Sequence, residues 1–342
     1  MRSLIDIQKK LLPDLLKVMQ KRYQILQYLK YMQPIGRRAL SISLGLTERT
    51  LRGEVSFLKD QGLISVAAGG MTITASGEEV LDELEETMRE VAGIGALESR
   101  IKELLGLAEV TVVPGNSDEA PWVQQEMGRA AVGRMKKRLK ADDIVAVTGG
   151  TTMAAVADMM TPETIAGDVL FVPARGGLGE DVKNQANSIC AQMAEKSEGH
   201  YRLLHVPERV SDEAYRSMIA EPSIKDVLDL IKSANMVVHG IGDAMMMAKR
   251  RKEPADTLQK LQDSRAVGEA FGYYFDRSGR IVHKVRTIGM QLDDLGKVDN
   301  VIAVAGGTSK AGAIAAFIKQ GQNSSLVTDE GAAKALLREL SL

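Results

Sequence analysis

Four short segments of the chain join an apolar run to a glycine-rich turn that carries hydroxyl groups or cations. They are residues 148–152 (TGGTT), 174–177 (ARGG), 240–243 (GIGD) and 306–310 (GGTSK). Backbone N–H groups in such a turn, together with hydroxyl groups at the start of a helix, form a cradle for an anion. Glycine also occurs in turns for conformational reasons alone, so each segment by itself is a weak indication. The first segment is the fullest candidate cradle, with Gly149, Gly150, Thr151 and Thr152.

Three cations accompany these turns. Arg175 lies in the second turn, Arg250 about two helical turns after the third, and Lys310 in the fourth. Three cations are more than one phosphate requires, so they favour a ligand with two anionic ends. Asp243 and Glu269 are candidate acceptors for sugar hydroxyl groups between those ends, although Glu269 is equally compatible with a surface carboxylate beside a hairpin.

Motifs for other chemistry are missing. The segment GIGDAM lacks the third glycine of a dinucleotide fingerprint, and AGGTSKAG lacks the spacing of a Walker A loop. The four histidines have no metal-ligand spacing, and there is no nucleophile-elbow G-x-S-x-G. We therefore predict no catalytic residue, no metal and no cofactor.

The elements that must position these turns alternate regularly from residue 109 onward. Apolar runs followed by glycine turns and amphipathic helices predict strands at 109–113, 144–147, 169–172, 202–206, 236–239, 301–305 and 326–328. This alternation favours a mostly parallel, doubly wound, Rossmann-like α/β sheet with helices on both faces. Ligands bind at the carboxyl ends of such strands, where the four turns fall. Residues 269–284 break the rhythm and predict an inserted hairpin.

The first 60 residues differ in charge and pattern. Twelve lysines and arginines face five acidic residues there, whereas the whole chain has a net charge of −1. Helix, turn, helix and hairpin follow one another, which is the order of a winged helix-turn-helix domain. Outward residues suited to phosphates and base edges are Arg38, Thr47, Arg49, Thr50, Arg52 and Ser56. These predict contact with double-stranded DNA, and a helical hairpin that binds a protein partner or a second copy is the alternative.

Residues 77–90 reverse the charge, with seven acids, one base and an apolar stripe. They predict a linker helix that either pairs with its copy in a dimer or lies on its own domain. A length of 342 residues favours two domains, and we place them at 1–90 and 91–342. The single cysteine, Cys190, and the lack of an apolar leader or membrane span predict a cytoplasmic protein.

Several longer stretches resemble one family. RRALSISLGLTERTLRGEVSFLKDQGLI, VAVTGGTTMAAVADMM, FVPARGGLGEDVKNQANSI, VVHGIGDAM, IAVAGGTSKAGAI and SLVTDEGAAKALL are together similar to SorC/DeoR-type sugar-sensing transcriptional regulators, over essentially the whole chain. The resemblance implies a C-terminal domain with the fold of sugar-phosphate isomerases and aminosugar-phosphate deaminases. It also implies a repressor of a glycolytic operon, a homodimer or homotetramer, released by a phosphorylated sugar, for this subgroup fructose 1,6-bisphosphate. By position the family's effector site corresponds to Thr151, Thr152, Arg175, Gln185, Arg250, Glu269 and Lys310.

The same fold leaves an enzyme as the alternative, namely a sugar-phosphate isomerase or deaminase. Such an enzyme needs a carboxylate base over the substrate carbon. The isomerases that the chain resembles carry an acidic stretch after a central strand, whereas PARGGLGED stands in that neighbourhood here. Loss of the base with retention of the cations is what we expect of a sensor derived from an enzyme.

Overall fold

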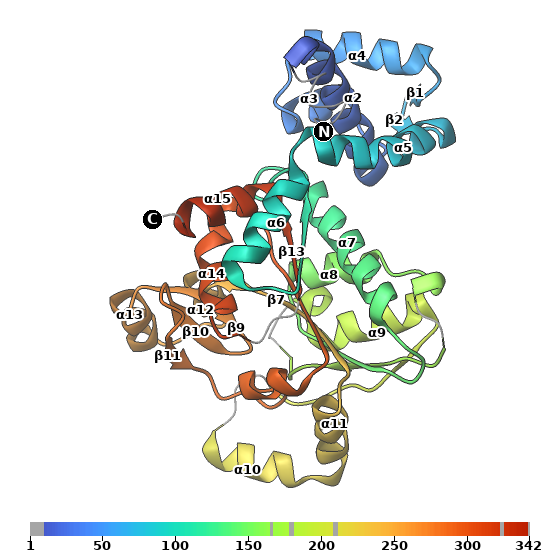
Figure 1. Cartoon of the computed structure of the whole chain (residues 1–342). Coiled ribbons are helices and arrows are strands. Elements are labelled where there is room, and N and C mark those ends of the chain that lie inside the picture. Colours follow the sequence, from blue (N-terminus) through green and yellow to red (C-terminus); the bar gives the residue numbers. More distant parts are fainter. Residues whose placement is uncertain (1–9, 165–166, 178–180, 208–210, 322–324, 341–342) are drawn as a thin grey trace. The chain divides into compact units, whose positions relative to one another are not determined.

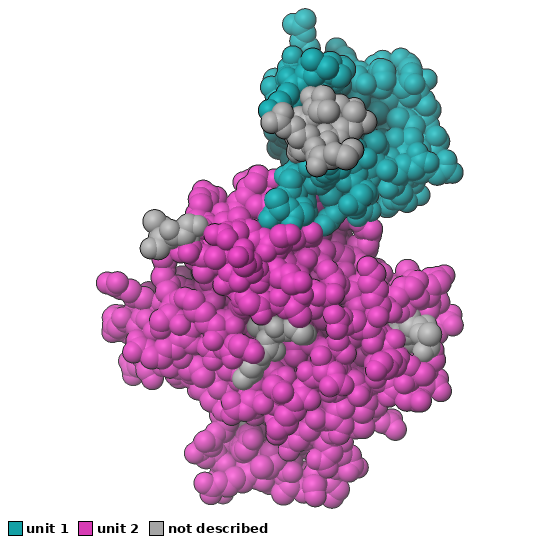
Figure 2. All heavy atoms as spheres, viewed as in Figure 1, with its two compact units in different colours: residues 1–96 teal, residues 97–342 magenta. Residues whose placement is uncertain are grey.

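The computed structural model describes residues 10–164, 167–177, 181–207, 211–321 and 325–340. The chain divides into two compact units, residues 1–96 and residues 97–342, which are teal and magenta in Figure 2. In the described residues, no helix has both the length and the apolar character that a membrane span requires.

Unit 1 has the predicted order of helix, turn, helix and hairpin (Figure 1). Its elements are α2 (Pro13–Met32), α3 (Arg37–Ser43), α4 (Glu48–Asp60), β1 (Ile64–Ala67), β2 (Gly70–Ile73) and α5 (Ala75–Val91). Strands β1 and β2 pair antiparallel, with Ile64 opposite Ile73. Helix α4 begins at the predicted cap, because the Thr47 side chain accepts a hydrogen bond from the Thr50 N–H.

Helix α5 lies on its own unit, which is the second of the two arrangements that the sequence left open. Leu81 and Met88 are buried there, and Lys30 of α2 forms an ion pair with Asp82 of α5 at 2.8 Å. The next helix, α6 (Ile94–Leu105), contains the division between the units.

Unit 2 is built on a seven-stranded sheet in the order β3-β13-β12-β7-β4-β5-β6, and every pairing in it is parallel. The strands are β3 (Glu109–Val113), β4 (Ile144–Val147), β5 (Leu170–Pro173), β6 (His200–Tyr201), β7 (Met236–Gly240), β12 (Asn300–Val304) and β13 (Ser325–Asp329). The helices are α7 (Trp122–Arg138), α8 (Thr151–Asp158), α9 (Ala186–Ser197), α10 (Asp212–Ala220), α11 (Pro222–Lys232), α12 (Ala244–Arg250), α13 (Ala255–Asp263), α14 (Ala311–Ile318) and α15 (Glu330–Leu340). The predicted parallel α/β class is therefore confirmed.

One predicted strand is wrong. Residues 202–206 form no strand, and the edge strand β6 is only His200–Tyr201. The ladder of β6 stops because the backbone of Leu204 bonds to a side chain and not to a neighbouring strand. Asn187 Oδ1 accepts from the Leu204 N–H, and Asn187 Nδ2 donates to the Leu204 carbonyl. A side-chain partner thus satisfies backbone groups that the apolar run alone assigns to a sheet.

The order of the strands defines where the sheet reverses its winding. From β4 the chain proceeds outward to β5 and β6, whereas from β7 it proceeds in the opposite direction to β12 and β13. Right-handed crossovers therefore place α7, α8 and α9 on one face of the sheet and α11 and α14 on the other. Figure 1 shows α7, α8 and α9 on one side of the sheet and α14 on the opposite side. The switch lies between β4 and β7, whose carboxyl ends open into the turns at 148–152 and 240–243.

The predicted hairpin belongs to a second, antiparallel sheet in the order β11-β10-β9-β8. Its strands are β8 (Gly242–Asp243), β9 (Ala266–Ala270), β10 (Tyr273–Asp276) and β11 (Ile281–Lys284). Because β8 directly follows β7, this sheet begins at the switch point and carries Glu269 back to it.

Helix α8, which carries Thr151 and Thr152, depends on a close approach to α7. A Cβ atom at Gly128 of α7 would lie 2.4 Å from the Ala155 carbonyl oxygen, whereas a Cβ atom at Gly133 of the same helix would meet nothing within 4 Å. We expect Gly128→Ala to lower the free energy of unfolding by about 1–3 kcal/mol, because α7 must move away from α8.

The matched control is Gly133→Ala, which we expect to be neutral or to stabilise by up to about 1 kcal/mol through helix propensity. Urea unfolding of both variants, followed by circular dichroism, measures the difference. Equal destabilisation by the two substitutions would contradict the role of the close approach.

Candidate functional site

A pocket lies at the switch point of the seven-stranded sheet. Its lining comes from the turns after β4 and β7, from α12, and from β9 and the residues after it. The sequence predicted nine ligand-binding residues, and eight of them line the pocket: Gly149, Gly150, Thr151, Thr152, Arg175, Arg250, Glu269 and Lys310. Segments that are far apart in the chain are thus brought to one place, where the fold class predicts a ligand.

The cradle at the start of α8 is open toward this pocket. Gly150 has a φ of 120°, in the region that favours glycine, and α8 has no side-chain cap at its N-terminus. Gln124 of α7 donates to the hydroxyl groups of Thr151 and Thr152, at 3.3 Å in each case. The positive end of the helix dipole and the uncapped amides favour an anion here.

Two further contacts fix this end of the sheet. The Thr148 hydroxyl accepts a hydrogen bond from the Gly240 N–H at 3.1 Å and so ties the turn after β4 to the end of β7. The Asp243 carboxylate caps α12 by accepting from the Met246 N–H at 2.8 Å. The sequence suggested Asp243 as an acceptor for sugar hydroxyl groups. Asp243 lines the pocket, but its carboxylate already accepts one backbone hydrogen bond.

Gln185 lies beside the pocket and not in its lining. It is the N-cap residue of α9, and the preceding residue, Asn184, accepts from the Gly150 N–H at 2.8 Å. A Cβ atom at Gly177 would lie 3.3 Å from its Oε1. Gln185 is thus adjacent to both the first and the second glycine turn, and its predicted role in ligand binding stays a prediction.

Glu269 is buried among cations and is not a surface carboxylate. Its Oε1 accepts from Arg251 Nη2 at 2.8 Å and from the Gly272 N–H at 2.7 Å, and Arg175 Nη1 lies 3.7 Å from the same oxygen. The side chains of Glu269 and Arg251 are 4% and 0% exposed, so this is an ion pair removed from water. Arg251 was not predicted from the sequence, because the basic segment KRRK (residues 249–252) does not distinguish it from its neighbour Arg250.

The charges around Glu269 decide its protonation. Burial alone would raise the pKa of the carboxyl group, but the charges of Arg251 and Arg175 and the hydrogen bonds from Arg251 and Gly272 outweigh it and hold the pKa below its ordinary value. Glu269 is therefore ionised near neutral pH. Its carboxylate can accept hydrogen bonds and is only a weak base.

The turn at 306–310 differs from its predicted role. The Gly307 N–H donates to Asp329 Oδ2 at 2.7 Å, and the Ser309 N–H and hydroxyl both donate to the carboxylate of Asp118, at 2.8 and 2.9 Å. The Thr308 N–H donates to Asn116. This turn is therefore not a phosphate cradle, because carboxylate and amide side chains of the protein already occupy its amides, and Lys310 is its contribution to the pocket.

Lys310 is held in an unusual environment. Burial lowers the pKa of its amino group, and the carboxylates of Asp118, Asp329 and Asp243 offset that effect only in part. An incoming anion would restore the favourable surroundings of the charged form. Arg250, by contrast, is exposed at the pocket.

Unit 1 presents the surface predicted to contact DNA. Leu51, Val55 and Leu58 of α4 are buried, and all six predicted DNA-binding residues are exposed, namely Arg38, Thr47, Arg49, Thr50, Arg52 and Ser56. The opposite side of α4 is neutralised internally, because Glu54 forms ion pairs with Lys21 at 3.1 Å and Arg22 at 2.8 Å. The exposed Arg38, Arg49 and Arg52 therefore place positive charge on the outward face of α3 and α4.

No group of three or more histidine, cysteine, aspartate or glutamate side chains suited to a metal ion is found among the residues that the structure describes. Cys190 is buried in α9, and burial raises the pKa of its thiol well above the ordinary value.

Both parts of the chain match known protein families. Residues 89–338 match the family of sugar-binding domains, and residues 18–88 match the CggR N-terminal DNA binding domain. The chain is 65% identical to a central glycolytic genes regulator of Priestia megaterium, over 100% of both chains, and 60% identical to that of Bacillus subtilis, over 99% of this chain and 100% of the other.

Solved structures of regulators share the fold of this chain. A SorC family transcriptional regulator from Enterococcus faecalis shares 45% identity and a TM-score of 0.67 over 71% of this chain and 99% of the other. The full-length sorbitol operon regulator SorC from Klebsiella pneumoniae shares the fold, with a TM-score of 0.65, 18% identity and coverage of 92% of this chain and 97% of the other. The named relatives are transcriptional regulators, and this chain matches both a DNA-binding and a sugar-binding domain, so the enzyme alternative is set aside. The chain belongs to the SorC-type family of sugar-binding transcriptional regulators.

Proposed function

We propose that this protein represses a glycolytic operon in the cytoplasm and that fructose 1,6-bisphosphate, bound in the pocket at the switch point, releases it from operator DNA. The observation that carries the ligand class is the pocket itself. It combines Arg250, Lys310 and the open start of α8, all suited to phosphate, with a buried ionised Glu269 suited to hydroxyl groups. A sugar with two phosphates matches this set.

The DNA-binding part of the proposal rests on unit 1. Its exposed arginines and hydroxyl groups lie on one face of a helix-turn-helix, while its remaining cations are partly used in internal ion pairs. The printed names of the most similar relatives supply the glycolytic operon. We also propose a homodimer or homotetramer, since a pair of such domains reads two half-sites of one operator.

Release follows from linkage between the two sites. A ligand that binds one conformation of unit 2 more tightly than another must shift the population toward it, and the DNA affinity changes by the same coupling free energy. The pocket lies at the ends of strands from both halves of the sheet, so closure around a bisphosphate changes how these halves are held together.

The bisphosphate should act directly on DNA binding. At one fixed salt concentration, fructose 1,6-bisphosphate should lower the affinity for the DNA upstream of the protein's own operon, whereas fructose 6-phosphate at equal ionic strength should not. Fluorescence anisotropy with a labelled duplex measures both, and salt is fixed because phosphate contacts make the affinity steeply salt-dependent. Unchanged DNA binding would refute fructose 1,6-bisphosphate as the ligand that releases the protein from DNA.

Two substitutions should separate the roles of the ligand pocket and the DNA-binding surface. Arg250→Ala should leave DNA affinity without ligand within twofold but raise the concentration of bisphosphate needed for release by about tenfold or more, because a charged hydrogen bond is lost. Arg52→Ala should do the reverse, weakening DNA binding by about tenfold and leaving bisphosphate affinity unchanged. The same anisotropy titrations, with calorimetry for the ligand, test both variants. Loss of DNA binding in folded Arg250→Ala would refute the separation.

Bisphosphate binding should depend on pH through Lys310. Burial lowers the pKa of Lys310 below 10.5, and a bound phosphate raises it again, so binding at alkaline pH takes up a proton. Bisphosphate affinity should therefore begin to fall, as the pH rises, at a pH below 10.5. Lys310→Arg keeps its charge throughout this range and should flatten the alkaline limb. Calorimetry from pH 7.5 upward, where the phosphates are already ionised, measures the effect. A wild-type profile as flat as that of the arginine variant would contradict the role of Lys310.

A further inference from the structure

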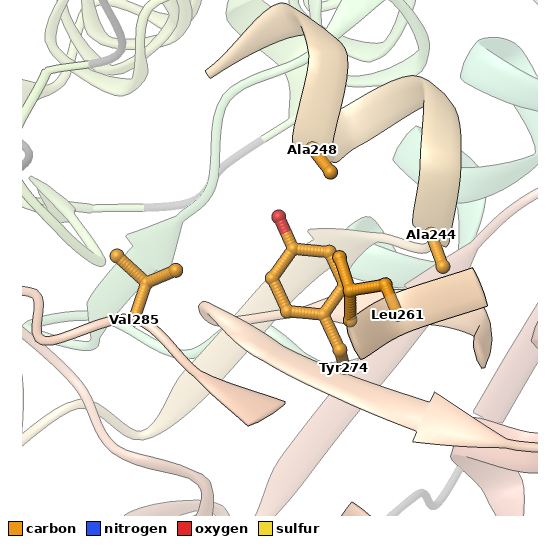
Figure 3. Close-up of a cluster of buried hydrophobic side chains, with 5 residues drawn as sticks. All are labelled: Ala244, Ala248, Leu261, Tyr274 and Val285. Carbon is orange, nitrogen blue, oxygen red and sulfur yellow. The ribbon is translucent and has the colours of Figure 1, made fainter. Parts of the chain in front are cut away.

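The buried side of the pocket contains a chain of contacts that leads from an apolar cluster to Glu269. The cluster consists of Ala244 and Ala248 of α12, Leu261 of α13, Tyr274 of β10, and Val285. Figure 3 shows the Tyr274 ring in the middle of these side chains. The ring is fully buried, so its position and that of its hydroxyl group are fixed by packing.

The hydroxyl group of Tyr274 in turn holds Arg251. Arg251 Nη1 donates to it at 3.1 Å, while Arg251 Nη2 donates to Glu269 Oε1 at 2.8 Å. Burial raises the pKa of Tyr274 to about 12, so the phenol remains neutral and accepts from the guanidinium. The guanidinium group of Arg251 is thus fixed by two hydrogen bonds, one to the packed Tyr274 and one to the carboxylate of Glu269 in the pocket.

Two donors and a further cation lie around one oxygen of Glu269. Arg251 Nη2 and the Gly272 N–H donate to Oε1, and Arg175 Nη1 forms an ion pair with the same oxygen at 3.7 Å. Within the described part of the chain, no hydrogen bond reaches Oε2, and Oε2 is not among the fully buried polar atoms without a partner. Because Glu269 lines the pocket, Oε2 is the oxygen that can accept from a ligand.

We propose that Arg251 and Tyr274 are positioning residues for hydroxyl recognition: they fix Glu269 so that Oε2 accepts a hydrogen bond from a sugar hydroxyl group, and they thereby make the pocket select polyhydroxy bisphosphates over bisphosphates without hydroxyl groups. Neither residue needs to touch the ligand. The inference rests on the proposed sugar-phosphate function and deepens it.

The selectivity has a physical reason. A carboxylate that is fixed and withdrawn from water loses its hydration when a ligand enters, and a ligand without a hydroxyl group leaves that charge without a partner on its pocket side. A carboxylate free to rotate would turn both oxygens toward the arginines and lose this discrimination. The ordering of Glu269 by Arg251 is therefore part of the specificity and not only of the stability.

The test compares two ligands, fructose 1,6-bisphosphate and 1,6-hexanediol bisphosphate, which has two phosphates and no hydroxyl groups. Calorimetry on the full-length protein gives both dissociation constants. Wild-type protein should prefer the sugar by about tenfold or more. Tyr274→Phe removes one oxygen from a packed ring. It should weaken binding of the sugar bisphosphate severalfold and change the dissociation constant of the diol bisphosphate by less than twofold.

Two further variants complete the experiment. Arg251→Met should abolish most of the preference for the sugar, with its folding checked by circular dichroism. Tyr273→Phe is the matched control, because its hydroxyl group donates to Gln291 Oε1 at 3.1 Å and not to the Arg251 network, and it should change neither constant.

The outcomes separate the inference from the proposed function. If folded Tyr274→Phe and Arg251→Met weaken both ligands by the same factor, or weaken neither, the positioning role is refuted while the ligand class stands. If wild-type protein binds the two ligands equally, the hydroxyl contact of Glu269 is refuted. If wild-type protein binds neither ligand, the proposed function itself fails and this inference fails with it.

Discussion

The buried carboxylate of Glu269 is the charge around which the ligand pocket of unit 2 is built. It joins β9 to Arg251, which follows α12, and to Arg175, which follows β5, and all three side chains are buried. Removal of one partner from a buried ion pair leaves an uncompensated charge, which costs more than the pair gains in stability. The antiparallel sheet and the turn after β5 are thus held to the switch point by electrostatics as well as by packing.

Two glycine-rich turns that look alike in the sequence have different roles for a reason of tertiary structure. The turn at 149–152 keeps an uncapped helix start toward the pocket, whereas the amides of the turn at 306–309 bind Asn116, Asp118 and Asp329. Asn116 and Asp118 lie nearly two hundred residues earlier in the chain. Glycine, hydroxyl groups and a following helix predict a cradle, but whether the cradle is vacant depends on a distant loop.

The same reasoning explains what the sequence could and could not predict. Hydrophobic periodicity and turn residues were sufficient for the parallel sheet, and the rule for strand ends then placed Thr151, Arg250 and Lys310 in one pocket. The short edge strand β6 could not be predicted, because Asn187 decides where its ladder ends. Arg251 could not be predicted either, since adjacent arginines on a short helix give no sign of which one turns inward.

The geometry around Glu269 also indicates which cation a ligand affects most. Arg251 is fixed by two hydrogen bonds with good distances, to Tyr274 and to Glu269, whereas Arg175 lies 3.7 Å from the same carboxylate. A phosphate is a stronger acceptor site for an arginine than a carboxylate oxygen already shared by two other donors. On the function proposed above, a bound phosphate would change the surroundings of Arg175, while Arg251 would keep Glu269 ionised and in place. Because Arg175 follows β5 and Glu269 lies on β9, a change in this one pair alters the connection between the parallel and the antiparallel sheet, which is the kind of discrete difference that an allosteric response requires.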